Sequence, residues 1–188
     1  MQSRSPYRVT FVCSGNICRS PIAEVVLAHA VAEAGLAGEV VVDSAGTGDW
    51  HVGAGADARA VQALHEVGLD GTAHRARLFD PTSFAGTDLV IALDAGHHEQ
   101  LSAWVRTPAD AGRIHLLRSF DPGAGQDLDV ADPFYGSEDD FVRVVEQIRG
   151  AVPGLLQRIR ADLAGDHIQA DHARAALEAD HPPGPTAP

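Results

Sequence analysis

The sequence predicts an α/β fold of three layers, in which a four-stranded, twisted parallel sheet carries helices on both of its faces. Short runs rich in β-branched residues alternate with longer segments of helical periodicity along the chain. This alternation is typical of β-α-β units, whose strands run parallel. A glycine-containing loop follows the first run, and such sheets hold ligands beyond the carboxyl ends of their strands. We therefore expect a phosphate-binding loop directly after strand one.

Four short apolar runs are expected to form the strands. They are RVTFVC (8–13), EVVVDSAGT (39–47), DLVIALD (88–94) and RIHLL (113–117). Helix signals separate them, so the elements follow one another in the order strand, helix, strand, helix along the chain. This order places the loop CSGNICR on the carboxyl edge of the predicted sheet.

The expected helices span residues 21–36, 57–67, 95–105 and 137–164. Pro21 lies in the first turn of the first of these, where proline is tolerated. Asp57 is placed to cap the second helix. The last helix opens with acidic residues at its positive end, and Pro153 is expected to kink it or divide it in two.

One domain suits the 188-residue length of the chain. We expect this domain to span residues 1–165. Residues 166–188 are rich in alanine, aspartate, histidine and proline. This composition predicts a flexible polar tail with room for a short helix over 170–179.

The composition excludes several classes of protein. The formal net charge of −12 argues against a nucleic-acid partner, because phosphate backbones select basic surfaces. Two cysteines cannot build a disulfide scaffold, which favours a reducing, cytoplasmic location. No signal peptide and no apolar run of about 20 residues is visible, so we expect no membrane contact. Secretion by a route that needs no signal peptide stays open.

The stretch FVCSGNICRSP (11–21) carries most of the chemical information. Gly15 and Asn16 tolerate left-handed backbone angles, so the loop can curl its N–H groups inward at a helix N-terminus. Such a nest binds anions. Arg19 at its rim can hold two phosphate oxygens in a bidentate fork.

Cys13 would then lie at the floor of a positive cup. Such surroundings can lower the pKa of a thiol from about 8.5 to roughly 4–7, and the thiolate can attack phosphorus. Ser20 could hydrogen-bond the thiolate and make it a better leaving group. The spacing of Cys13 and Arg19 is weak evidence alone, but the preceding strand, the glycine and asparagine, and the following helix strengthen it. The competing interpretation is a small turn with two buried thiols.

These residues resemble a known family. VCSGNICRSP closely resembles the signature loop of the low-molecular-weight protein-tyrosine phosphatases, and the resemblance covers roughly residues 7–164. It includes DSAGTGDW (43–50), AHRAR (73–77), LVIALD (89–94) and DPFYG (132–136). The chain is most similar to the actinobacterial branch, which includes the mycobacterial protein-tyrosine phosphatase A type. The resemblance implies metal-free, cofactor-free hydrolysis of phosphotyrosine through a cysteinyl-phosphate, with a tyrosine-phosphorylated protein as partner.

A phosphotyrosine ester needs an acid to protonate its leaving oxygen. Asp80, Asp121 and Asp132 each precede a proline. Asp80 precedes the third strand and falls near the wrong edge of the sheet. Topology leaves both Asp121 and Asp132 open, because both follow the fourth strand. The aromatic pair Phe134–Tyr135 favours Asp132, and the resemblance also points to it.

Further residues are expected to bind substrate or support the loop. The substrate-binding set comprises Ser14, Gly15, Asn16, Ile17, Cys18, Ser20, Trp50, Phe134 and Tyr135. Its aromatic members would wall a slot that favours phosphotyrosine over phosphoserine. The resemblance implies that Asn16, Ser44 and His74 brace the loop, and that Asp94 orients the arginine or a loop. It also implies a reversible disulfide between Cys18 and Cys13, whereas the alternative role of Cys18 is a buried small hydrophobe.

The histidines do not predict a metal site. His97, His98 and Glu99 form one cluster, and His167, His172 and His181 form another. Neither spacing fits a zinc template. We expect a solvated helix face for the first cluster and a polar tail for the second.

Four alternatives remain beside the tyrosine phosphatase. An arsenate reductase would need a downstream cysteine pair that is missing. A protein-arginine phosphatase resembles this loop but carries threonine where this chain has Ile17. A phospho-ligand binding module would lack the nucleophile or acid, and a flavodoxin-like flavin protein needs no cysteine. A monomer is the expected oligomeric state, and a cognate tyrosine kinase is a candidate partner.

Overall fold

The computed structural model describes residues 5–179, with side chains described for residues 5–165. The chain divides into two compact units, Met1–Leu156 and Gln157–Pro188. The first unit contains the sheet and the predicted loop, and the second is helical as far as Ala179. Of the flexible tail expected over 166–188, residues 166–179 continue a helix, and residues 180–188 lie outside the described residues.

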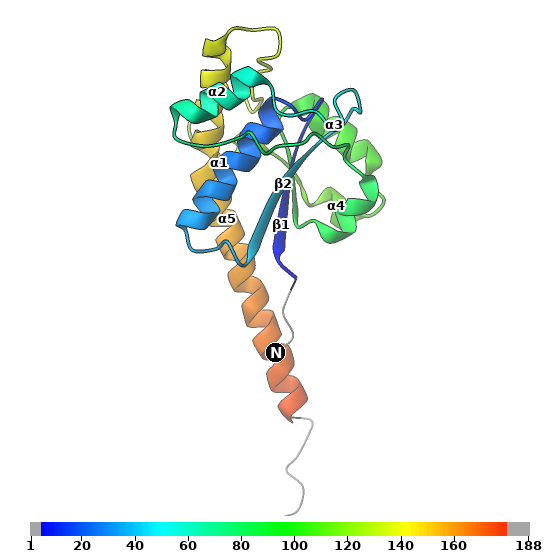
Figure 1. Ribbon diagram of the computed structural model, residues 1–188. Coiled ribbons are helices and arrows are strands. Elements are labelled where there is room, and N and C mark those ends of the chain that lie inside the picture. Colours follow the sequence, from blue (N-terminus) through cyan, green and yellow to red (C-terminus); the bar gives the residue numbers. More distant parts are fainter. Residues whose placement is uncertain (1–4, 180–188) are drawn as a thin grey trace, which may run out of the picture. The chain divides into compact units, whose positions relative to one another are not determined.

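Four parallel strands form one sheet in the order β2-β1-β3-β4 (Figure 1). Their bounds are β1 Tyr7–Cys13, β2 Val40–Gly46, β3 Leu89–Ala92 and β4 Ile114–Leu116. The register pairs Cys13 with Gly46 and Val12 with Ala92. The loops that follow β1, β2 and β3 therefore leave the sheet at the same edge, where the first loop was expected.

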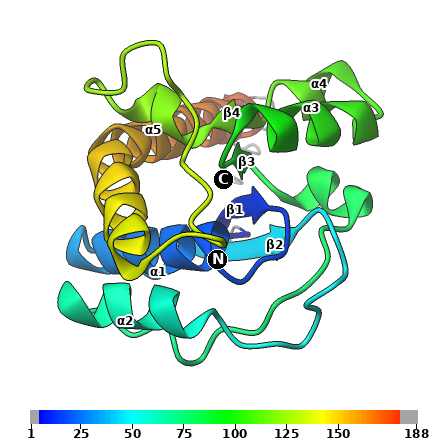
Figure 2. The same ribbon diagram turned by 90° about the horizontal axis from the view of Figure 1, so that it is seen from above.

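Helices cover both faces of this sheet, which confirms the three-layer prediction. Figure 2 shows α1 and the beginning of α5 on one side of the strands, with α3 and α4 on the other. The helices are α1 Arg19–Glu33, α2 Ala58–Glu66, α3 Ala95–Trp104, α4 Pro108–Ala111 and α5 Glu138–Ala179, and the 3-10 turns are η1 Pro81–Gly86 and η2 Leu117–Phe120. The sequence did not predict α4 or the 3-10 turns, because each spans too few residues for a periodic pattern.

Two helices, α1 and α5, depart from the prediction in ways that bear on the site or the fold. α1 begins at Arg19, so the arginine of the loop is itself the first helical residue. α5 is one helix that contains Pro153, so the predicted division there is wrong. Before the proline this helix buries a continuous apolar stripe that includes Phe141, Val144 and Ile148. Burial of such a stripe stabilises a helix more than its local propensity does, which offsets the cost of an internal proline.

Backbone hydrogen bonds hold the loops together at the carboxyl edge. The N–H of Thr47 donates to the carbonyl of Cys13 at 2.8 Å, which joins the loops after β1 and β2. The N–H of Val130 donates to the carbonyl of Leu93 at 2.8 Å, which brings the late loop before α5 beside β3. Segments far apart in the sequence thus meet above the first strand.

Candidate active site

Asn16 fixes the path of the loop after β1. Its φ of 54° is the only positive value of a non-glycine residue within the described chain. Its buried amide nitrogen donates to the hydroxyls of Ser20 at 2.9 Å and Ser44 at 2.8 Å. Its side-chain oxygen accepts the backbone N–H of Arg77 at 2.9 Å, and its carbonyl lies 2.7 Å from Nε2 of His74. The structure therefore brings together Asn16, Ser44 and His74, the three residues expected to brace the loop.

Two glycines allow the loop to lie close to its neighbours. A Cβ atom on Gly46, at the end of β2, would lie 2.7 Å from the carbonyl oxygen of Ser14. A Cβ atom on Gly15 would lie 2.8 Å from Cδ2 of His51. Gly15 has no positive φ, so the loop does not use the left-handed angles that this glycine tolerates. Its role is to leave room for the imidazole.

Cys13 lies buried at the end of β1 and its sulfur is 2.9 Å from the hydroxyl oxygen of Ser20. That oxygen also accepts from the amide of Asn16, and it lies 3.4 Å from the carbonyl of Ala45. The NH₂ group of Asn16 can only donate, so the hydroxyl proton of Ser20 can point at the sulfur, which is closer than the carbonyl of Ala45. This arrangement can stabilise negative charge on Cys13.

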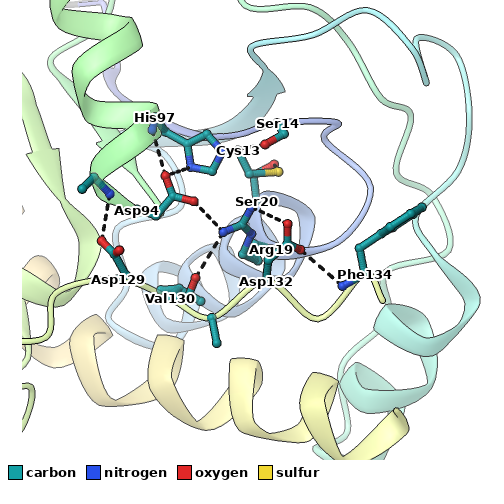
Figure 3. A network of polar contacts seen from close by, with 12 residues as sticks. Cys13, Ser14, Arg19, Ser20, Asp94, His97, Asp129, Val130, Asp132 and Phe134 are labelled. Carbon is teal, nitrogen blue, oxygen red and sulfur yellow. Dashed lines mark hydrogen bonds and ion pairs between the residues drawn. The ribbon is translucent and has the colours of Figure 1, made fainter. Parts of the chain in front are cut away.

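Arg19 is 4% exposed and reaches three oxygen atoms, one after β3 and two in the loop before α5 (Figure 3). One guanidinium nitrogen donates to Oδ2 of Asp94 at 2.7 Å and to the carbonyl of Val130 at 3.2 Å. The other terminal nitrogen donates to Oδ2 of Asp132 at 3.1 Å. The two carboxylates compensate the buried charge and fix the orientation of the guanidinium.

The structure distinguishes Asp132 from Asp121, the two candidate proton donors that topology left open. Asp132 lines the same cavity as Cys13, and its side chain is 53% exposed there. Asp121 instead accepts the backbone N–H of Gly123 at 2.8 Å and does not line this cavity. Asp80 accepts the N–H of Thr82 at 2.8 Å at the start of η1, as a helix cap.

The cavity over the loop has a volume of about 280 Å³. It is lined by Cys13, Ser14, Gly15, Ile17, Cys18, Arg19, Trp50, His51, Asp132, Phe134 and Tyr135. Asn16 and Ser20 are fully buried and support the cavity from behind. Trp50 and Tyr135 are 71% and 96% exposed, so they stand at the mouth of the cavity. The predicted aromatic wall is therefore a rim that is open to solvent.

Sequence reasoning missed His51 as a cavity residue. Its ring lies 6.3 Å from that of Phe134, tilted by 47°. His51 follows Trp50 directly in the sequence, which was the available signal.

Asp94 links α3 to the arginine. It caps the helix, because its Oδ1 accepts the backbone N–H of His97 at 2.8 Å, while its Oδ2 accepts from Arg19. Burial alone would raise the pKa of this carboxyl, but hydrogen bonds from the ring and backbone of His97 and the charges of His97 and Arg19 bring it well below the ordinary value. Asp94 thus remains ionised beside the guanidinium.

His97 corrects a sequence expectation. Its cluster was expected to form a solvated helix face, yet His97 is 4% exposed. The ring lies in the first turn of α3, which faces the loop, and its Nε2 is 2.8 Å from the hydroxyl of Ser14. Its Nδ1 lies 2.8 Å from Oδ1 of Asp94. No group of three or more potential metal ligands occurs among the described side chains.

Cys18 is a buried free thiol that borders the cavity. Burial, followed by the charges of Asp57, Cys13 and Asp132, raises the pKa of Cys18 to about 12. Cys18 is therefore a neutral thiol at physiological pH, which suits the small hydrophobe of its alternative role. The disulfide with Cys13 stays a prediction, since both cysteines are free here.

Arg59 is a second residue that sequence reasoning missed. Its guanidinium pairs with Asp57 at 2.8 Å and donates to the carbonyls of Phe134 at 3.0 Å and Gly136 at 2.9 Å. It also lies over the ring of Phe141, 4.6 Å from the centroid. The loop that carries Asp132 is therefore attached to the N-terminus of α2.

The comparisons with known proteins agree with this geometry. A family model described as low molecular weight phosphotyrosine protein phosphatase matches residues 8–165. A low molecular weight protein-tyrosine-phosphatase of Streptomyces coelicolor is 52% identical over 162 residues, which cover 85% of this chain and 97% of that protein. The low molecular weight protein-tyrosine phosphatase A of Mycobacterium bovis is 47% identical over 151 residues, covering 80% and 90%.

A solved structure shares the fold. The protein tyrosine phosphatase of Entamoeba histolytica, crystallised with Hepes in its active site, superimposes with a TM-score of 0.79 at 28% identity. The match covers 83% of this chain and 98% of that one. No helix among the described residues is long and apolar enough to cross a membrane. With the loop, the sheet order and these matches in agreement, the chain belongs to the low molecular weight phosphotyrosine protein phosphatase family.

Proposed function

We propose that this chain hydrolyses phosphotyrosine monoesters in proteins through a cysteinyl-phosphate, without a metal. The observation that carries this proposal is the shared cavity of Cys13, Arg19 and Asp132, which come from β1, α1 and the loop before α5. A sulfur nucleophile, a guanidinium and a carboxyl group on one cavity supply the attacking atom, the oxyanion clamp and the proton donor of phosphoryl transfer.

In the first step the thiolate of Cys13 attacks phosphorus, forming the S–P bond as the bond to the tyrosyl oxygen breaks. The backbone N–H groups of residues 14–19 and the guanidinium of Arg19 hold the equatorial oxygens. Asp94 accepts a hydrogen bond from Arg19 and so holds the guanidinium in the orientation needed to bind these oxygens. Asp132, at the mouth of the cavity, donates its proton to the leaving oxygen.

In the second step Asp132 accepts a proton from water, and the water oxygen attacks the cysteinyl-phosphate. The S–P bond breaks and its electron pair returns to Cys13. Ser20 can donate a hydrogen bond to the departing sulfur, because its hydroxyl lies 2.9 Å from it. Inorganic phosphate then leaves the loop and restores the starting enzyme.

The rim of the cavity favours an aromatic phosphoester. Trp50, Phe134 and Tyr135 surround the mouth, while the loop lies at the floor. A phosphotyrosine side chain is long and flat enough to reach the floor with its ring between these aromatic groups. A phosphoserine side chain is shorter, so its phosphate would not reach Cys13 while its backbone stays outside the rim.

The other predicted chemistries have less support. Ile17 lines the cavity. The loop of the arginine-phosphatase branch, which resembles this one, has threonine at that position. The described side chains include no third cysteine for an arsenate relay. A binding module would not need an acid at the mouth, and a flavin protein would not need a thiol at the floor. The substrates are phosphoproteins, and we further propose a cognate tyrosine kinase, a monomeric state and a cytoplasmic location.

Phosphate release from phosphotyrosyl, phosphoseryl and phosphoarginyl peptides in EDTA tests the proposed function. We expect release from phosphotyrosine, unaffected by EDTA and lost in Cys13→Ser. Cys18→Ser is the matched control, because it changes the other thiol of the same loop. Release from phosphoarginine alone would show that the chain is a protein-arginine phosphatase. Activity that survives Cys13→Ser would overturn the mechanism.

A further inference from the structure

The contacts of His97 connect the phosphate loop to the helix behind it. Its Nε2 lies 2.8 Å from the hydroxyl of Ser14, which lines the cavity next to Cys13. Its Nδ1 lies 2.8 Å from Oδ1 of Asp94, and the other oxygen of Asp94 accepts from Arg19. Figure 3 shows this series of side chains running behind the loop from Ser14 to the arginine.

The carboxylate decides where the ring carries its first proton. A bare Nδ1 lone pair 2.8 Å from an ionised oxygen would be repelled, so Nδ1 carries hydrogen. This nitrogen is buried against Oδ1 of Asp94, an oxygen that also accepts the backbone N–H of His97. The attraction between the ring and the carboxylate is strongest when the ring is cationic.

The second proton decides the direction of the Ser14 hydroxyl. In a neutral ring Nε2 is an acceptor, so Ser14 must donate to it and can offer only lone pairs to the cavity. In a cationic ring Nε2 is a donor, so Ser14 accepts from it and its own proton is free. Only the second arrangement lets Ser14 donate a hydrogen bond to a phosphoryl oxygen.

The charges around the ring favour the cationic form when substrate is bound. The facing groups are Asp94 at the N-cap of α3, Arg19 on α1, Cys13 at the end of β1, and Asp129, which accepts the N–H of Ala95 at 2.8 Å. Arg19 already faces two carboxylates, Asp94 and Asp132. A phosphoryl dianion adds negative charge that this one guanidinium does not balance. Histidine is the side chain that can gain a proton near neutral pH.

We propose that His97 is a positioning residue that sets the direction of the Ser14 hydroxyl. When a phosphoryl group enters the loop, the ring takes up a proton from solvent, Nε2 donates to Ser14, and the Ser14 O–H turns towards the phosphoryl oxygens. The proton returns to solvent when phosphate leaves. This inference rests on the proposed function of the loop, and it adds proton uptake on binding and a role for Ser14 as a donor.

The first test observes the ring directly in the wild-type chain. Sulfate is the probe, because its charge stays at −2 across the neutral range while that of phosphate changes. Nitrogen-15 spectra recorded at a fixed, neutral pH should show an increase in the doubly protonated fraction of the His97 ring as sulfate saturates the loop. Site-specific assignment separates this signal from that of His51, which also borders the cavity.

The second test uses variants that separate donation from charge. His97→Gln keeps an N–H donor for Ser14 but cannot titrate, whereas His97→Leu keeps the bulk without a donor. Sulfate inhibition of the wild type should weaken as the pH rises, because the ring loses its second proton. We expect His97→Gln to lose this pH dependence and to bind sulfate within about threefold of the wild type at neutral pH. We expect His97→Leu to bind sulfate about tenfold more weakly than His97→Gln at every pH. KM for phosphotyrosine should follow the same order, with kcat changed less than KM.

Two further variants complete the design. Ser14→Ala should lose the same pH dependence, because the hydroxyl is the group that the ring orients. His98→Gln, next to His97 on the same helix, should keep it. A ring that stays neutral with sulfate bound to an active enzyme would overturn this inference alone. Loss of both sulfate binding and turnover from the wild type would overturn the proposed function as well.

Discussion

The guanidinium of Arg59 donates to the main-chain carbonyl of Phe134 at 3.0 Å, across 75 residues of sequence. The same guanidinium pairs with Asp57, whose own N–H donates to the carbonyl of Ile17 in the phosphate loop at 2.8 Å. The pair therefore connects the loop that supplies the acid to the loop that supplies the nucleophile. This connection determines how well Asp132 can be placed over a bound ester.

Arg59→Ala should reduce catalysis by releasing the acid loop. We expect kcat/KM for a phenyl phosphate to fall by about 10-fold to 100-fold, because small displacements of a catalytic group are costly. The loss should be smaller for a dinitrophenyl phosphate, whose leaving group needs less protonation. Arg75→Ala is the control, since Arg75 is exposed and contacts only nearby carbonyls. Equal losses with both esters would mean that Arg59 acts on binding instead.

Asp132→Asn should remove the proton donor while keeping the shape of the side chain. We expect kcat for phosphotyrosine to fall by about 10²-fold to 10⁴-fold, the usual contribution of general acid catalysis. Asp121→Asn is the matched control, because Asp121 also precedes a proline and lies outside the cavity. Steady-state kinetics on both variants separate the two candidates. A large loss in the Asp121 variant and none in the Asp132 variant would reverse the assignment.

Asn16 combines a strained backbone with a buried polar network, and two substitutions separate these contributions. Asn16→Gly keeps the positive φ but leaves the partners of the amide unpaired, which should lower the free energy of unfolding by about 2–4 kcal/mol. Asn16→Ala loses the same bonds and must also hold the left-handed conformation, which costs about 1 kcal/mol more. Urea denaturation of both variants measures the difference. An alanine variant more stable than the glycine variant would show that the backbone relaxes.

Cys18 should resist alkylation near neutral pH, because burial raises the pKa of its thiol to about 12 and the thiolate is the reactive form. In the Cys13→Ser background, where Cys18 is the remaining cysteine, iodoacetamide should react slowly at pH 7 and progressively faster as the pH rises above 9. The unfolded variant in urea, with an ordinary thiol, supplies the reference rate. Equal rates in the folded and unfolded chains at pH 7 would contradict the assignment.

The strands and the phosphate loop could be predicted because their signals are local. A short β-branched run followed by glycine, asparagine and arginine restricts the backbone to few conformations, and parallel topology places its end at the sheet edge. The resemblance added Ser44, His74 and Asp94, which the structure brings to the loop. The choice of Asp132 as the proton donor rested on its aromatic neighbours and on the resemblance, because topology did not distinguish it from Asp121.

The missed residues depend on tertiary contacts. His97 meets Ser14 across 83 residues, and Arg59 meets Phe134 across 75. Neither pair has a spacing that single-sequence periodicity can report, because periodicity describes one element at a time. The continuous α5 has the same cause, since buried contacts along its apolar face outweigh the local preference of Pro153.

The aromatic rim also gives the protein an optical property. The chain has two tryptophans, and their surroundings differ. Trp104 is partly buried and stacks on Phe79 against the core at 6.2 Å between ring centroids, whereas Trp50 stands 71% exposed at the cavity mouth. A soluble quencher such as acrylamide therefore reaches the Trp50 indole more easily than the Trp104 indole. The more easily quenched part of the fluorescence belongs to Trp50, so it reports occupancy of the cavity without any added label.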